Sequence, residues 1–338
     1  MQHVHVITPG LFTTVQDLGR VGYQRFGVPV AGVFDTVSAQ VANWLVGNKG
    51  DAAVLEITFA GPTLRTEVTL QAAITGGQLQ ATLDGKPVPM WQSFTWQAGQ
   101  TLAIGNITAG ARAYLAVSGE GWQVPVVMDS RSTYVRAAIG GLEGRQLQAG
   151  DQLPVSSEHP PYTHRYLPQA FWPIVADEIC LRFVPGPQTD HFEPDAVEKL
   201  CASTYTVSQA SDRMGLRLQG PSIVPLKPDI ISDAIALGSM QVPRDGQPIV
   251  MGPDRQTTGG YPKIGTVITA DIVRLAQARP GTKITWQAVT VAEAQELAKA
   301  YVDQLYRMQQ VINKEIAGRS FQVQIGDKVL HSFVERLH

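Results

Sequence analysis

Short stretches in which apolar and polar residues alternate dominate the chain and predict β-strands. Residues 52–77, 78–90 and 111–119 all alternate in this way, as half-buried strands do. Within the second of them, the pair Asp84-Gly85 is typical of a two-residue hairpin turn. The pattern therefore predicts a mainly β protein.

Two segments carry helical periodicity instead. Residues 35–47 place their apolar side chains on one face, begin at an aspartate suited to an N-cap and end at a glycine. Residues 290–317 form the longer pattern, in which Thr290 and Glu293 have the spacing of a capping box and Gly318 follows as a stop. We expect few helices outside these two segments.

A proline-rich segment divides the chain. Residues 156–173 hold four prolines and little periodicity, which is typical of a linker. We therefore predict an N-terminal β-barrel-like half over 1–155 and a second half over 174–290. The C-terminal extension, 291–338, is predicted to contain the long helix and a hairpin around Gly326-Asp327.

Composition narrows the class of protein. The 338 residues are 44% hydrophobic and 17% charged, enough to bury ordinary cores, and the net charge of −2 gives no footprint for nucleic acid or an anionic membrane. No signal-peptide pattern and no apolar run long enough to cross a membrane is seen, so we expect a cytoplasmic protein. Cys180 and Cys201 lack metal-ligand spacing and are predicted to be two buried thiols.

Familiar catalytic motifs are missing from the sequence. It has no phosphate-binding loop, no zinc-protease helix motif and no nucleophile elbow, and residues 140–145 are interpreted as a turn rather than a dinucleotide fingerprint. His3 and His5 alternate on one predicted strand face, but no third ligand is near them in sequence. We therefore predict no metal site.

Four polar, glycine-rich stretches remain to be explained. Arginine offers a planar fork for carboxylate or phosphate, and backbone N–H groups exposed by glycines suit oxyanions. Taken singly, each stretch is equally well explained as a solvated loop with structural ion pairs. The stretches are residues 13–35, 128–145, 208–221 and 241–262.

Taken together, these stretches resemble one known family. "TTVQDLGRVGYQRFGVPVAGVFD", "AIGGLEGR", "SDRMGLRLQGP" and "QVPRDGQPIVMGPDRQTTGGYPKIG" are similar to the second half of the biotin-dependent carboxyltransferase family. Its members include the C subunit of 5-oxoprolinase, the antagonist of a sporulation-kinase inhibitor, and the carboxyltransferase module of urea carboxylase. The motifs stand in order over residues 7 to about 290, and the sequence most resembles the 5-oxoprolinase type.

The resemblance implies a fold, partners and an activity. It implies cyclophilin-like β-barrel subdomains and a partner, a homologue of the 5-oxoprolinase B subunit, that supplies the other half of a carboxyltransferase-like unit. With a separate lactam hydrolase, the A subunit, the complex would use ATP to cleave 5-oxoproline to glutamate, and this chain alone would be inactive. No nucleotide motif shows where ATP binds, and no biotin-attachment lysine is present, so the chain carries no biotin itself.

Two alternatives stay open at this point. One is a regulatory protein that binds a kinase-inhibitor partner, as the sporulation antagonist does. The other is half of a carboxyltransferase that acts on urea-like amides with a biotin carrier. Both alternative functions occur in the family that the sequence resembles, so the sequence motifs do not distinguish between them.

The resemblance also places the active site in the stretch 241–262. Asp254 is suited to proton transfer, Arg213 to holding a carboxylate or phosphorylated intermediate, and Gln256 to a bidentate amide contact, so these three are the predicted catalytic residues. Amide side chains suit a lactam or ureido group, which presents both C=O and N–H. Glycines allow the backbone to approach a ligand closely. The predicted substrate-binding residues are Arg20, Ser211, Gln241, Gln247, Thr257, Gly259, Gly260 and Tyr261.

Overall fold

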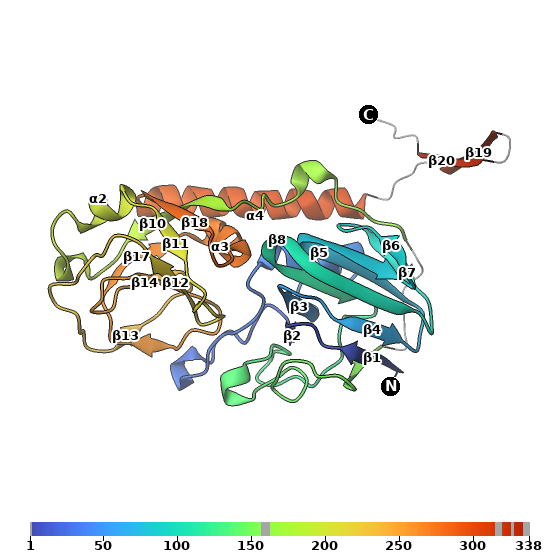
Figure 1. Cartoon of the computed structure of the whole chain (residues 1–338), viewed down its shortest axis with the longest axis horizontal. Coiled ribbons are helices and arrows are strands. Elements are labelled where there is room, and N and C mark those ends of the chain that lie inside the picture. Colours follow the sequence, from blue (N-terminus) through green and yellow to red (C-terminus); the bar gives the residue numbers. More distant parts are fainter. Residues whose placement is uncertain (1, 157–162, 315–319, 326–327, 334–338) are drawn as a thin grey trace.

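The computed structural model describes residues 2–156, 163–314, 320–325 and 328–333, the last two segments by their backbone alone. Two β structures lie side by side, and one long helix runs along both of them (Figure 1). The mainly β class is confirmed. The predicted helix stop at Gly318 and the turn at Gly326-Asp327 lie outside the described residues.

The first half is a nine-stranded sheet whose strands follow the order β2-β3-β8-β4-β1-β9, with β5 pairing β6, β7 and β8. Its two long strands, β5 and β8, curve around the core as a half-barrel (Figure 1). The strands are β1 (Gln2–Thr8), β2 (Phe12–Gln16), β3 (Val54–Thr58), β4 (Thr63–Thr66), β5 (Leu70–Leu83), β6 (Lys86–Val88), β7 (Ser93–Trp96), β8 (Thr101–Val117) and β9 (Gln152–Val155).

The second half closes into a barrel in the order β10-β17-β14-β15-β12-β11-β18, and a small ribbon, β13 with β16, lies beside it. Its core includes Phe34, which reaches in from the first half. The strands are β10 (Glu178–Pro185), β11 (Tyr205–Val207), β12 (Gly215–Gln219), β13 (Asp233–Ala234), β14 (Ser239–Gln241), β15 (Ile249–Met251), β16 (Thr258–Gly259), β17 (Lys263–Val267) and β18 (Lys283–Ala288). A separate hairpin pairs β19 (Ser320–Ile325) with β20 (Lys328–Phe333).

Helices connect the two halves. The described residues form α1 (Thr36–Leu45), α2 (Ala196–Cys201), α3 (Ile272–Gln277) and α4 (Val291–Asn313), and the predicted cap of α1 is confirmed because the Asp35 carboxylate accepts the Ser38 N–H at 2.9 Å. Although α4 starts at the barrel, its far end buries Met308 and Ile312 against α1 and the first sheet. The long helix therefore ties the two halves together.

Strand alternation aims several side chains of the first sheet at the second half. In β3, Leu55 and Ile57 enter the core of the sheet, so Glu56 points to the opposite face. In β8, Arg112 and Tyr114 lie on that same opposite face, and all three are buried. Alternation thus places three polar side chains where the barrel meets the sheet.

Three local predictions can be compared with the structure. The turn at Asp84-Gly85 is confirmed, with φ of 48° and 80° joining β5 to β6. The prediction of two buried thiols is wrong, because Cys180 is exposed at an outward position of β10 and Cys201 is half-buried. His5, one of the two histidines considered as metal ligands, instead donates from Nε2 to the Glu67 carboxylate at 2.6 Å.

The capping box of α4 gives a direct test of local stability. Thr290 Oγ1 accepts the Glu293 N–H at 3.2 Å, and Glu293 accepts the Thr290 N–H at 2.7 Å. We expect Thr290→Ala to lower the free energy of unfolding by about 1 kcal/mol, because an N–H at the helix start loses its acceptor. Thr290→Asp keeps an acceptor and should change it little; equal losses in urea denaturation of both variants would contradict this.

Candidate functional site

A cavity of about 320 Å³ lies where the sheet meets the barrel. Leu11, Phe12 and Phe59 form part of its wall from the first half, and Val207 and Leu216 do so from the barrel. Of the residues predicted for the site, Ser211, Arg213 and Asp254 line this cavity. Its size and its mixture of apolar and polar walls are typical of a small-molecule site.

The pair of Arg213 and Asp254 forms the charged part of the cavity wall. Arg213 donates to both carboxylate oxygens of Asp254, from Nε and from Nη2, each at 3.0 Å, and both side chains are buried. Nη2 also donates to the Gly32 carbonyl at 2.6 Å, and Nη1 donates to Glu56. Each guanidinium nitrogen therefore has a protein acceptor already.

This pairing changes the interpretation of Arg213. Burial alone would lower its pKa, but the charges of Asp254 and Glu56 raise the pKa above the ordinary arginine value. The guanidinium therefore stays charged and holds two carboxylates at once. A contact from Arg213 to a substrate anion stays a prediction, and the observed contacts fit a residue that fixes the orientation of Asp254.

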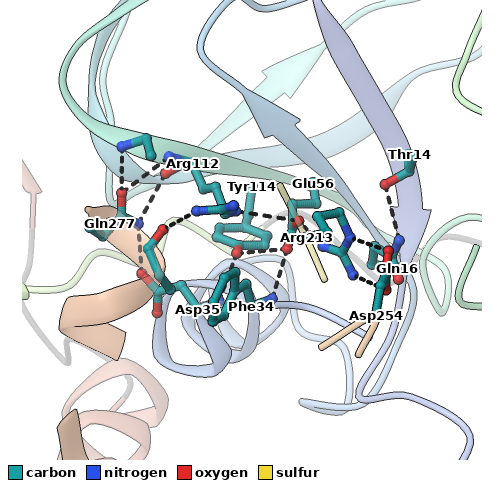
Figure 2. A network of polar contacts seen from close by, with 12 residues as sticks. Thr14, Gln16, Phe34, Asp35, Glu56, Arg112, Tyr114, Arg213, Asp254 and Gln277 are labelled. Carbon is teal, nitrogen blue, oxygen red and sulfur yellow. Dashed lines mark hydrogen bonds and ion pairs between the residues drawn. The ribbon is translucent and has the colours of Figure 1, made fainter. Parts of the chain in front are cut away.

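Glu56 extends this ion pair into the first half (Figure 2). Its Oε2 accepts the Tyr114 hydroxyl at 2.9 Å and the Phe34 N–H at 2.8 Å, and Arg112 Nε lies 3.8 Å from its Oε1. Burial raises the pKa of Tyr114 well above its ordinary value, so the phenol stays protonated and donates a hydrogen bond to Glu56. Glu56 is thus a buried acceptor shared between the sheet and the barrel.

A second branch joins α1 to α3. Gln277 donates to Asp35 at 2.8 Å and to the Arg112 carbonyl at 3.1 Å, while its side-chain oxygen accepts the Arg112 N–H at 3.1 Å. Burial raises the pKa of Asp35, although its bonds from Ser38 and Gln277 act in the opposite direction. The network therefore connects the first sheet, α1, the barrel and α3 across one junction (Figure 2).

Arg20 lies fully buried close to this junction. Its Nη2 donates to the Ser132 carbonyl at 2.5 Å, whereas Nε and Nη1 have no hydrogen-bond acceptor among the described residues. Burial lowers its pKa, and the charges of Asp17 and Asp254 offset part of that effect. The structure therefore brings Arg20 within the electrostatic reach of Asp254 but not into the lining of the cavity.

The remaining predicted residues do not line the cavity, and several of them lie in or beside the β13–β16 ribbon. Gln241 is buried, and its Nε2 lies 2.7 Å from where a side chain on Gly259 would begin, so that glycine accommodates protein packing. Gln256 Oε1 is buried without a partner among the described residues. Gln247 bonds both ways to the Gly220 backbone, at 2.9 and 3.1 Å, which is a structural role.

Backbone pairing accounts for most of the other predicted positions. Thr257 and Gly260 accept backbone bonds from Ile235 and Ile230, at 3.0 and 2.9 Å, and the Tyr261 side chain is exposed. The stretch 241–262 thus contributes Asp254 to the cavity and directs the rest of its predicted residues elsewhere. Their roles toward a substrate stay predictions.

Comparison with known proteins places the sequence in a family. The sequence model of the carboxyltransferase domain, subdomains A and B, matches residues 26–288. The chain belongs to this carboxyltransferase family. Among curated members, it is 38% identical over 299 residues to the 5-oxoprolinase C subunit of Haemophilus influenzae, covering 87% of this chain and 95% of that protein. It is also 38% identical over 291 residues to the protein of the same name from Escherichia coli, covering 86% and 92%.

Two solved structures share the fold. The Kluyveromyces lactis urea carboxylase superposes with a TM-score of 0.86 at 27% identity, covering 97% of this chain and 30% of that one. TTHA0988 superposes with a TM-score of 0.77 at 36% identity, covering 85% of this chain and 55% of that one. Both are therefore much longer polypeptides in which this fold is one part.

Sequence reasoning on this carboxyltransferase-family chain missed Glu56, Arg112 and Tyr114. All three are in strands, where an alternating pattern does not distinguish a solvent-facing polar residue from one that faces another domain. Glu56 gave one usable signal, since it stands between Leu55 and Ile57 in a strand that is otherwise apolar. A charge at the centre of such a strand needs a partner when both faces are covered.

Within the described residues, no group of three or more histidine, cysteine, aspartate or glutamate side chains is arranged to hold a metal ion. No helix in that part of the chain is long and apolar enough to cross a membrane.

Proposed function

We propose that the chain is the C subunit of a 5-oxoprolinase. The observation that carries the proposal is that two proteins of this name match it along 95% and 92% of their own length. The urea-processing relatives match it only as a segment, for example 17% of the Saccharomyces cerevisiae urea amidolyase. Similarity over nearly the whole length of both C subunits favours the same role for this chain.

The proposed complex includes a B-subunit homologue and a lactam-hydrolase A subunit, and cleaves 5-oxoproline with ATP in the cytoplasm. The cavity supports a shared site, because its lining holds no histidine, cysteine or lysine to activate Ser211 or to act as the nucleophile, and its acidic groups are Asp212 and Asp254. The Ser211 hydroxyl instead accepts the Arg217 N–H at 3.0 Å. We therefore expect this chain to be silent without its partners.

Within that complex, we propose that Asp254 acts on the substrate and that Arg213 positions it. Asp254 lines the cavity, and the bidentate pair holds its carboxylate in one orientation. The unpartnered oxygen of Gln256 has the chemistry for a lactam N–H and the buried cation of Arg20 for a substrate carboxylate, but neither lines the cavity, so both contacts would require the site to extend beyond it in the assembled complex. Substrate contacts from Gln241, Thr257, Gly259, Gly260 and Tyr261 would likewise require the site to extend beyond the cavity.

One observation favours a second candidate, the carboxyltransferase half of an enzyme for urea-like amides. The urea carboxylase structure covers 97% of this chain, with a TM-score of 0.86. That function would need a biotin carrier on another protein. Both candidate functions would use the same cavity, and they differ in the substrate of the complex.

Separate assays with the two candidate substrates test the proposal. The chain is purified with its A-subunit and B-subunit homologues and with a biotin carboxylase and carrier, and ADP release is measured with 5-oxoproline or with urea. We expect ADP release and equimolar glutamate with 5-oxoproline, and no carrier requirement. Turnover of urea that depends on the carrier would instead establish the second candidate.

A further inference from the structure

Two short loops of the first half expose a concentration of large apolar side chains. They are residues 17–27 and 126–138, which lie next to each other at the lower edge of Figure 1, in blue and in green. Val21 is 75% exposed, Phe26 66% and Val126 55%. The apolar loop surface, as we name it, consists of Leu18, Val21, Phe26, Val126, Met128 and Val135.

Hydrogen bonds, most of them partly buried, hold the two loops against each other. The Asp17 carboxylate accepts the Ser130 hydroxyl at 2.6 Å, the Ser132 hydroxyl at 2.5 Å and the Arg131 N–H at 2.5 Å. Tyr23 adds a bond to Asp129 at 2.7 Å. The exposed side chains are therefore presented on a braced platform, which lowers the entropy lost when a partner binds.

The second loop is also strained. Met128, Asp129 and Ala138 have φ values of 52°, 58° and 52°, in the left-handed region that side chains other than glycine rarely occupy. Such conformations are strained and persist where the surroundings impose them, commonly at functional sites. The surrounding fold thus holds this loop in a backbone conformation that Met128 and Ala138 do not favour.

Two arginines that form no ion pair among the described residues stand next in sequence to Phe26 and Val135, whereas Leu18 lines a hollow that also holds the carboxylates of Asp17, Asp51, Glu120 and Asp129. These arginines, Arg25 and Arg136, are both exposed. The guanidinium carbon of Arg25 lies 4.7 Å from the centre of the Phe26 ring, so this positive charge is adjacent to one of the exposed apolar side chains. An apolar centre with free cations at its rim complements an apolar patch rimmed by carboxylates.

The apolar loop surface adjoins the mouth of the candidate site. Val135 and Arg136 belong to the second loop and also line the 320 Å³ cavity. A protein seated on the loops would therefore cover the cavity from outside. The cavity would then be enclosed by two chains, and the partner would supply the nucleophile that the lining lacks beside Asp254.

We infer that the apolar loop surface docks the partner chain that completes this site, through an apolar patch rimmed by acidic side chains. The inference rests on the proposed function for the existence of that partner. It also draws on the solved relative TTHA0988, where the matched fold is only 55% of the polypeptide and a further portion is joined to it. The assigned occupant is the B-subunit homologue rather than a second copy of this chain.

Calorimetric titration of the full chain with the B-subunit homologue of the same genome tests the inference. We expect Val21→Asp and Phe26→Asp each to weaken binding at least about ten-fold, because a charge enters the apolar centre of the interface. Arg25→Glu combined with Arg136→Glu should weaken it too and should remove most of its salt dependence. Val302→Asp is the matched control, since Val302 is 60% exposed on α4, and it should bind like wild type.

Melting temperature and sedimentation of each variant separate the outcomes. Weaker binding by folded, monomeric loop variants, with the control unchanged, supports the inference. Wild-type affinity in both apolar-loop variants overturns it, and so does self-association of the wild type that these variants abolish. Should the wild-type pair bind and leave 5-oxoproline intact, the docking surface stands and the proposed function fails; should the wild-type pair not bind, the docking surface itself is wrong.

Discussion

Replacing Arg213 by alanine is expected to lower the free energy of unfolding by about 3–5 kcal/mol, because two buried carboxylates lose their shared cation. Asp254 and Glu56 both contact this guanidinium, and the side chain of Glu56 is only 1% exposed. Arg213→Lys keeps the charge but not the bidentate geometry, and should lose a smaller part of that stability. Urea denaturation measures both variants.

A surface ion pair provides the control for Arg213. Arg244 pairs with Asp229, but the two side chains are 72% and 62% exposed. Arg244→Ala should therefore change the free energy of unfolding by less than about 1 kcal/mol. If the two alanine variants lose equal stability, Arg213 does not organise the junction between sheet and barrel.

Asp254→Asn is expected to lower kcat of the reconstituted complex by about a hundred-fold or more, because the site loses a positioned group for proton transfer. The substitution also removes a charge from Arg213, so stability falls as well. Glu56→Gln separates the two effects, since Glu56 contacts the same guanidinium without lining the cavity. It should lower stability and leave kcat per folded complex within a few-fold of wild type.

The comparison of these two variants decides the role of the ion pair. Equal losses of kcat in Asp254→Asn and Glu56→Gln, measured at a temperature where both complexes are folded, would show that the pair acts only as structure. An unchanged kcat in Asp254→Asn would show that Asp254 takes no part in the catalytic reaction.

Local signals in the sequence predicted the elements well. The caps at Asp35 and Thr290 depend on residues three positions apart, and both form in the structure. The turn at Asp84-Gly85 depends on two adjacent residues that tolerate positive φ. Each of these features is specified within a few residues, so the sequence alone is sufficient to predict it.

Long-range features were predicted less well. The bond between Arg213 and Glu56 joins residues 157 positions apart, and no local pattern reports such a pairing. The resemblance to a known family brought Arg213 and Asp254 to attention, but their mutual pairing had to come from the structure. Gln247 was predicted to bind substrate because its amide can donate and accept hydrogen bonds. In the structure that amide is bonded to the Gly220 backbone instead.

The exposed thiol shows the same limit on a smaller scale. Free cysteine is commonly buried, which led to the wrong prediction for Cys180. In β10, Ile179 and Leu181 point inward, so the residue between them must point outward. Here the alternation of the strand outweighs the preference of the residue type.

The central claim is that this chain supplies one side of a site that its partners complete. The most direct measurement is a titration of the chain into fixed amounts of the A-subunit and B-subunit homologues, with glutamate formation from 5-oxoproline and ATP as the readout. The account predicts no glutamate from the chain alone, and a rate that rises with added chain and saturates at a fixed ratio to the B-subunit homologue. Glutamate formation by the purified chain alone, or a rate with the partners that does not depend on the chain, would contradict it.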